Sequence, residues 1–122
     1  MKTLKLVLTL LFGALMILAG INHFLKPEIY YSFFPEIAPK AFLTYASGLL
    51  EIMAGVLVFI PAYRHWGTLS ILVLMLLFLP FHIWDVFSLS PAIGSRQAAL
   101  IRLPIQFLFI LWAWFIHKKT RA

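Results

Sequence analysis

The chain has 122 residues, of which 63% are hydrophobic and only 11% are charged. Soluble domains contain roughly 25% charged residues, so this composition excludes an ordinary soluble protein and indicates a membrane protein with one domain, residues 1–122. The formal net charge of +6 does not indicate a nucleic-acid-binding protein, because the basic residues stand singly or in pairs at the ends of apolar runs.

Four apolar stretches long enough to cross a bilayer follow one another along the chain. An α-helix rises about 1.5 Å per residue, so about 20 apolar residues cover the ~30 Å hydrocarbon core. The connections after the second and third stretches are short, which makes neighbouring helices antiparallel. We therefore predict an all-α fold, a membrane-embedded up-down-up-down four-helix bundle with helices at about residues 4–25, 41–61, 66–88 and 97–117.

The first stretch begins after Lys2 and Lys5 and has the outline of a signal peptide. Its apolar run nevertheless continues to Ile21, and no small-residue cleavage site precedes the polar residues that follow. We therefore expect it to remain in place as a transmembrane helix. At helical spacing, one face of this helix carries Gly13, Met16, Gly20 and His23.

Residues 26–40, which join the first two helices, contain three prolines and four aromatic residues. This segment is too apolar for a solvated linker, and Pro27 suits the first turn of a short helix. We predict a short interfacial helix or lid in this first outer loop. Its aromatic residues are Tyr30, Tyr31, Phe33 and Phe34.

The second stretch contains an acidic residue, Glu51, near its middle. Residues 42–50 before it and 52–63 after it are uncharged. A helix here would hold the carboxyl group near the bilayer centre, where an ionisable residue by default marks a function. One face of this helix combines Glu51 with small or polar residues, and the opposite face is bulky and apolar, so we expect the first to pack and the second to meet lipid. The small or polar residues are Thr44, Ser47, Gly48, Ala54 and Gly55.

Polar residues of the other helices lie toward the same, outer end of the bundle. His82 and Asp85 are three residues apart and Arg102 and Gln106 four apart, so each pair shares one helix face. Counted from the outer helix ends, Arg102 can contact Asp85 and reach toward Glu51. The predicted polar set is Asn22, His23, Ser47, Glu51, His82, Asp85, Arg102 and Gln106.

Two interpretations of this polar set remain open. Polar groups inside a membrane commonly pair, so the set could be a structural network that fixes helix register. Alternatively, it lines a pocket, open outward or laterally, that orients a small amphipathic molecule. The histidine spacing matches no metal motif, and we predict no metal site. The absence of cysteine excludes a thiol nucleophile and thiol redox chemistry, and no self-contained catalytic motif is present.

The basic residues in the flanking segments predict the orientation. Six lie on one side and three on the other, which by the positive-inside rule places both termini in the cytoplasm of a multi-pass protein of the plasma (inner) membrane. The six are Lys2, Lys5, Arg64, Lys118, Lys119 and Arg121, and the three are Lys26, Lys40 and Arg96.

Four sequence elements in order follow the pattern of a known family. They are AGINHFLKP (19–27) with the aromatic loop after it, YASGLLEIMAGVLVFIP (45–61), LPFHIWDV (79–86) and RLPIQ (102–106). With these elements the chain resembles the DoxX-like family of small four-helix membrane proteins. The resemblance implies a superfamily that includes subunits linked to thiosulfate and quinone oxidoreduction and to methylamine-dehydrogenase maturation. Relatives that use thiol chemistry carry cysteines, which this chain lacks.

We therefore expect a membrane subunit that binds a quinone-like or lipid-like small molecule in association with an oxidoreductase system. Glu51 and Arg102 would form the polar floor of its site, beneath the aromatic lid. Any catalysis would be that of a subunit in a membrane oxidoreductase. The alternatives are a non-enzymatic anchor or assembly factor for a partner complex, and proton or small-solute transport. The bilayer, an oxidoreductase subunit and further copies of the chain are the candidate partners, whereas nucleic acid is not.

Overall fold

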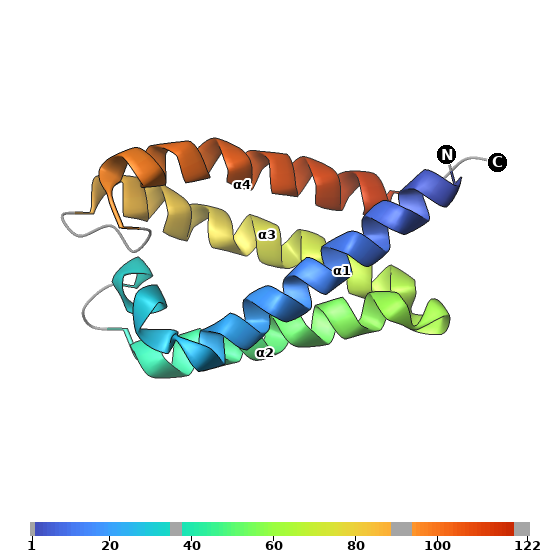
Figure 1. The fold of residues 1–122 in the computed structure, drawn as a ribbon, viewed down its shortest axis with the longest axis horizontal. Coiled ribbons are helices and arrows are strands. Elements are labelled where there is room, and N and C mark those ends of the chain that lie inside the picture. The colour runs from blue at the N-terminus through green and yellow to red at the C-terminus, as the bar shows by residue number, and fades with distance from the viewer. Residues whose placement is uncertain (1, 35–37, 89–93, 119–122) are drawn as a thin grey trace.

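The computed structural model describes residues 2–34, 38–88 and 94–118 and contains four long helices packed antiparallel (Figure 1). All four are long and apolar enough to cross a membrane, which confirms the predicted all-α four-helix fold. The helices are α1 (Lys2–Leu25), α2 (Lys40–Phe59), α3 (Arg64–Phe87) and α4 (Arg96–His117). Two short 3₁₀ helices lie in the connections, η1 (Pro27–Phe33) and η2 (Pro61–Tyr63). Lys119 and Arg121, which we counted for orientation, lie outside the described residues.

The helix bounds differ from the predicted ones by at most two residues, and the differences of two residues lie at the start of α1 and on both sides of η2. Helix α2 ends at Phe59 rather than at residue 61, and Ile60 is extended, with φ −102° and ψ 109°. Pro61 has no N–H to continue the helical hydrogen bonds, and its fixed φ suits the first turn of a new helix. It therefore opens η2, and α3 begins directly after it at Arg64.

The helices form two closely packed pairs. Helix α1 crosses α2, and α3 lies along α4, while α2 and α3 join the pairs (Figure 1). Helix α1 meets α4 mainly near the chain ends, where Nε1 of Trp112 donates to the carbonyl oxygen of Leu8 at 3.2 Å. At the opposite end η1 contacts α1, α2 and α3. The start of α1 and the end of α4 thus lie at one end of the bundle, and η1 lies at the other.

Glycines bring the backbones of α1 and α2 into contact. A Cβ atom on Gly20 would lie 2.5 Å from the carbonyl oxygen of Gly48, and one on Gly48 would lie 3.0 Å from that of Gly20. Two turns away, a Cβ atom on Gly55 would lie 2.5 Å from the carbonyl oxygen of Gly13. Larger residues would force the helices apart, because such distances are well below ordinary contact. The small-residue face therefore packs, as predicted.

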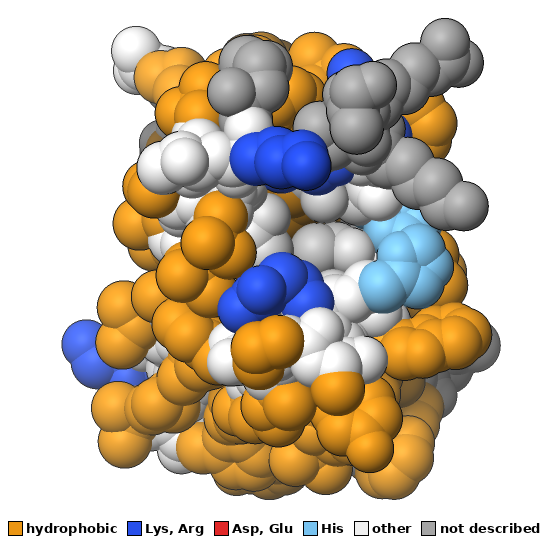
Figure 2. All heavy atoms as spheres, turned by 90° about the vertical axis from the view of Figure 1, so that its right-hand side faces the viewer, with side chains coloured by type: hydrophobic (Ala, Val, Ile, Leu, Met, Phe, Trp, Pro, Cys, Tyr) orange, Lys and Arg blue, Asp and Glu red, His pale blue; other side chains and the backbone are white. Residues whose placement is uncertain are grey.

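Most bulky side chains in the middle of α2 are exposed. Glu51 and its small neighbours are buried. Leu49, Leu50, Met53 and Val56 are exposed. Figure 2, which looks onto the end where α1 begins and α4 ends, shows hydrophobic side chains around much of the periphery and Lys, Arg and His nearer the middle. Exposed apolar surface of this extent is suited to lipid rather than water.

A compact apolar core fills the half of the bundle nearer the chain ends. Val58 and Ile71 are fully buried there, and Phe12 and Ala113 pack with them from α1 and α4. The residues of the predicted set that contact η1 lie in the other half, and they are Asn22, His23 and His82. The apolar core therefore separates the candidate site from the end of the bundle where the chain begins and ends.

Candidate functional site

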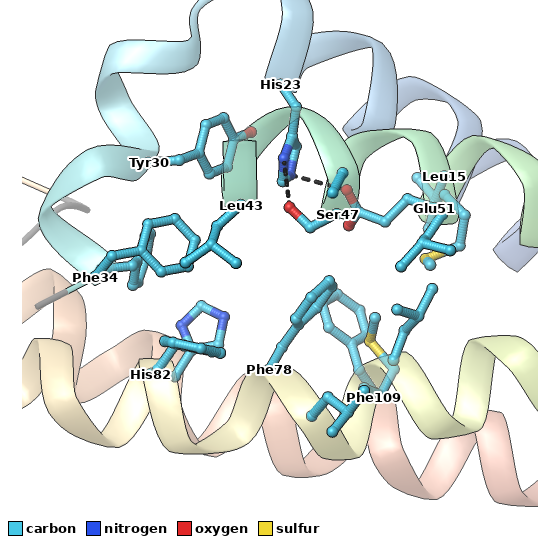
Figure 3. Close-up of a pocket in the computed structure, with 18 of the residues that line it drawn as sticks. Leu15, His23, Tyr30, Phe34, Leu43, Ser47, Glu51, Phe78, His82 and Phe109 are labelled. Atoms are coloured by element: carbon cyan, nitrogen blue, oxygen red, sulfur yellow. Dashed lines mark hydrogen bonds and ion pairs between the residues drawn. The ribbon is translucent and has the colours of Figure 1, made fainter. Parts of the chain in front are cut away.

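A cavity of about 580 Å³ lies between the two helix pairs and under η1 (Figure 3). Its wall includes side chains from all four helices and from η1, and most of these are aromatic or aliphatic. The polar residues in the wall are His23, Tyr30, Ser47, Glu51, His82 and Arg102. A mostly apolar cavity with a few convergent polar groups is the usual form of a small-molecule site.

Glu51 forms a buried ion pair with His23 of the neighbouring helix α1. Oε2 of Glu51 lies 2.8 Å from Nε2 of the imidazole, and both side chains are less than a tenth exposed, at 6% and 8%. The other ring nitrogen, Nδ1, lies 2.9 Å from the carbonyl oxygen of Thr44 and 3.1 Å from Oγ of Ser47. A carbonyl oxygen can only accept, so Nδ1 carries a hydrogen and donates it to Thr44.

This arrangement places one proton between the histidine and the glutamate. Because Nδ1 already bears a hydrogen, the 2.8 Å contact at Nε2 requires another proton, either on the ring or on the carboxyl group. In both forms the pair has zero net charge, which lowers the cost of burying it in the membrane. Oε2 of Glu51 has no further hydrogen-bond partner among the described residues.

The partner of Glu51 differs from the one that we expected. Sequence spacing pointed to Arg102, whereas the structure places His23 at ion-pair distance. The reason is the close glycine contact between α1 and α2, which brings the imidazole directly over the carboxyl group. Arg102 belongs to the other helix pair, and among the described residues no ion pair joins it to Glu51.

Arg102 lines the cavity and has one buried nitrogen that lacks a hydrogen-bond partner among the described residues. Its Cζ lies 5.1 Å from the centroid of the Phe109 ring, so the guanidinium rests over an aromatic face. Nη1 is buried and has no hydrogen-bond partner among the described residues. A buried N–H group without an acceptor is costly, so an acceptor atom of a ligand would be strongly favoured here.

Tyr30 in η1 covers the ion pair. Its ring stacks on the His23 imidazole with 3.9 Å between centroids, and its hydroxyl accepts a 2.7 Å hydrogen bond from Nδ2 of Asn22. Burial raises the pKa of the Tyr30 hydroxyl above its ordinary value of 10.0, so the group stays protonated at neutral pH. Tyr30 thus orients the imidazole without adding charge.

Phe33 at the end of η1 and Phe34 directly after it reach across to α3. Phe33 meets the His82 ring edge-on at 5.2 Å, and Phe34 meets Phe81 in the same way at 5.2 Å. Both phenylalanines line the cavity, whereas Tyr31 does not contribute to its wall. Helix η1 therefore bridges the two helix pairs over one end of the cavity, in the position that we predicted for a lid.

The predicted polar residues separate into two groups. Those that line the cavity are His23, Ser47, Glu51, His82 and Arg102. The others lie outside its wall: Asn22 bonds Tyr30, Asp85 is 1% exposed in the last turn of α3, and Gln106 donates from Nε2 to the Met75 carbonyl oxygen at 2.7 Å. Within the described residues, no three His, Cys, Asp or Glu side chains come together as metal ligands.

Sequence analysis missed the aromatic residues that the long helices contribute to the wall. Phe78 and Phe109 face the cavity from α3 and α4 (Figure 3). Phe78 lies four residues before His82, and Phe109 lies seven residues after Arg102, so each shares a helix face with a predicted polar residue. Helical spacing from the polar residues was therefore the signal that could have found them.

Comparison with known families places the chain. Residues 12–117 match the family described as Domain of unknown function (DUF8561), and this segment contains every residue that lines the cavity. The chain belongs to the DUF8561 family. No curated protein and no solved structure matched this DUF8561 protein. The match does not assign it to the DoxX-like family, so that likeness stays a resemblance of motifs.

Proposed function

We propose that this DUF8561 protein is a membrane subunit that binds a quinone-like small molecule in the cavity, in association with an oxidoreductase. The observation that carries the proposal is the combination of an apolar cavity, an unsatisfied Arg102 Nη1 and a buried His23–Glu51 pair that shares one proton. The volume of about 580 Å³ lies within the roughly 300 to 1,000 Å³ typical of small-molecule sites.

A quinone ring suits the chemistry of this wall. It is flat and apolar, with carbonyl oxygens at its opposite edges, and Phe78 and Phe109 offer aromatic surface against which such a ring can pack. The guanidinium group of Arg102, which lines the cavity, can donate to one carbonyl oxygen. An isoprenoid or acyl tail would leave the cavity toward the surrounding lipid.

The His23–Glu51 pair suits the proton chemistry of such a ligand. Reduction of a quinone to a quinol consumes two electrons and two protons. The electrons would come from a partner oxidoreductase subunit, and the pair would give one proton at a time to a reduced oxygen and then regain it from water. The resemblance to the DoxX-like family, which includes subunits linked to quinone oxidoreduction, supports this association.

The apolar core makes transport a weaker explanation of the same residues. A proton or solute that entered the cavity would have to pass the half of the bundle where Val58 and Ile71 are fully buried and Phe12 is 2% exposed. A purely structural anchor, in turn, would be expected to satisfy the buried Nη1 of Arg102 within the protein. Ligand binding requires no path through the apolar core, and it supplies a hydrogen-bond acceptor for Arg102.

Trp112 provides a direct test of binding. Its ring lies 4.4 Å from Phe12, which lines the cavity, whereas Trp66, Trp84 and Trp114 are more than half exposed and can be replaced by Phe. We expect a short-chain benzoquinone to quench the fluorescence of this single-Trp variant saturably in lipid nanodiscs. Arg102→Met should raise the Kd roughly ten- to hundredfold, because a hydrogen bond to a charged group contributes about 1.5 to 3 kcal/mol.

Arg96→Met is the matched control, since it removes a charge from the same helix at an exposed position outside the cavity wall. Glu51→Gln should still fold and bind, because its amide can donate to Nε2 of His23, but it should lose the proton exchange that accompanies quinone reduction. Linear, unsaturable quenching in the unsubstituted cavity, or equal effects of Arg102→Met and Arg96→Met, would refute the proposal. Tight retention of a phospholipid with no quinone binding would reassign the cavity to a lipid-like ligand.

A further inference from the structure

A second cavity, of about 280 Å³, lies at the other end of the bundle. Residues from the first turns of α1 and α3 and from the end of α4 form its wall. Figure 2 looks onto this end and shows Lys, Arg and His side chains around a hollow. The basic groups in the wall are Lys2, Lys5, Arg64, His65, His117 and Lys118. We call this the basic cavity.

Contacts within the protein hold these basic groups in place. Nε of Arg64 donates to the carbonyl oxygen of Val58 at 2.7 Å, which leaves the two terminal nitrogens of the guanidinium for another acceptor. Nζ of Lys5 donates to the carbonyl oxygen of Lys118 and so joins α1 to the end of α4. Nδ1 of His117 lies 3.0 Å from Oγ1 of Thr68. Hydrogen bonds therefore fix several side chains of the basic cavity, which is formed by three helices.

Among the described residues, the wall of the basic cavity contains no acidic side chain. The acidic residues of the described ranges are Glu28 in η1, Glu51 in the middle of α2 and Asp85 in the last turn of α3, all away from this end. Four Lys and Arg side chains in one hollow repel one another, and a bound anion would lower their electrostatic free energy. The positive charge of the wall therefore favours the binding of an anionic ligand.

The basic cavity lies at the depth of lipid headgroups. Tyr63, Trp66 and Trp114 surround the same end of the bundle and are 54%, 60% and 52% exposed. Exposed Tyr and Trp side chains of membrane proteins gather where the hydrocarbon core meets the headgroups. Helix α1, with 24 residues, is about 36 Å long and exceeds the ~30 Å core, so its first turn reaches that level.

We propose that the basic cavity binds a phosphate group, presented by the headgroup of an anionic phospholipid. The terminal nitrogens of Arg64 match two phosphate oxygens, and Lys2, Lys5 and Lys118 supply further positive charge. Basic pockets between transmembrane helices are known to take anionic headgroups. Charges that serve only to orient a protein need no shared hollow, whereas these converge on one from three helices.

Lipid retention tests this proposal. The protein is reconstituted in nanodiscs with equal amounts of phosphatidate and phosphatidylcholine, extracted into mild detergent and examined by native mass spectrometry. We expect retained phosphatidate to exceed phosphatidylcholine at least tenfold, and Lys5→Gln with Arg64→Gln to remove most of that excess. Lys26→Gln with Arg96→Gln removes the same number of charges at the opposite end and should leave the excess unchanged.

Because Arg64 also bonds the backbone, a second variant keeps the test independent of folding. Lys2→Gln with Lys118→Gln changes two exposed side chains and should lower the phosphatidate excess severalfold. Equal retention of the two lipids, or equal losses in the control, would overturn the proposal. In nanodiscs of phosphatidylcholine alone, added inorganic phosphate should stabilise the protein only weakly. Strong stabilisation by inorganic phosphate without lipid enrichment would assign the site to free phosphate and overturn the lipid source.

Discussion

The buried carboxyl group of Glu51 is accommodated by three specific contacts of one imidazole ring. Thr44 fixes the hydrogen on Nδ1 of His23, Tyr30 stacks on the ring face, and Nε2 faces the carboxyl group at 2.8 Å. The pair therefore has zero net charge, whichever of the two residues holds the shared proton. Removal of either member leaves the other without its counterpart.

A double-mutant cycle measures this coupling. We expect His23→Leu and Glu51→Leu each to lower the free energy of unfolding in mixed micelles by about 3 to 5 kcal/mol, because one partner is left buried and unpaired. The double variant should lose clearly less than the sum of the two single losses. The same cycle between Glu51→Leu and Arg102→Met serves as the control and should be close to additive. Strong coupling in that control, with additivity at His23, would contradict the observed pairing.

At the level of elements, the α1–α2 contact determines how far His23 can reach. Gly20 and Gly48 allow the two backbones to touch, and this contact lies directly beside the imidazole: a Cβ atom on Gly48 would lie 2.6 Å from Cβ of His23. The helix contact and the ion pair therefore depend on one another. On the other side of α2, the bulky residues face outward and place no such demand on the packing.

Gly48→Ala tests this dependence. The added methyl group must push α1 from α2, so we expect a loss of about 1 to 3 kcal/mol in the free energy of unfolding and weaker benzoquinone binding. Leu49→Ala is the matched control on the next residue, which is 52% exposed, and it should change the free energy of unfolding by no more than about 0.5 kcal/mol. If both variants lower the free energy of unfolding by the same amount, the close contact between α1 and α2 does not stabilise the site.

At the level of the whole molecule, the two ends of the bundle differ. One end contains the basic cavity and both chain ends of the described bundle, joined by the bond from Lys5 to the Lys118 carbonyl oxygen. The other contains η1 and the larger cavity. When the bundle spans a membrane, the two cavities therefore lie toward opposite sides of the bilayer. The positive-inside rule favours the basic end in the cytoplasm.

The absence of native cysteine makes this orientation easy to measure. We expect single cysteines in place of Lys2 and Lys118 to be protected from a membrane-impermeant maleimide in intact cells, and cysteines in place of Lys26 and Arg96 to be labelled. Labelling after the membrane is permeabilised provides the control for access. Protection of the cysteine in place of Lys2 together with labelling of the cysteine in place of Lys118 would contradict the four-span fold itself. Reversal of the labelling at all four positions would contradict only the predicted orientation.

The sequence by itself determined the helices and most of their faces. Hydropathy and helical spacing are local properties, so the four spans and the buried face around Glu51 could be predicted without knowledge of tertiary contacts. Spacing also selected five residues of the cavity wall, because polar side chains inside a membrane have to face the bundle interior. A short helix in the first outer loop was predicted in the same way, from the composition of residues 26–40, and η1 lies there.

Only the tertiary structure decided which residues meet. The partner of Glu51 depends on which two helices touch most closely, and the complementary backbones at Gly20 and Gly48 draw α1 to α2 and leave α4 across the cavity. The basic cavity likewise unites Lys5, Arg64 and Lys118, which are far apart in the chain. Sequence spacing within a helix cannot report such meetings, because they arise from shape complementarity between separate helices.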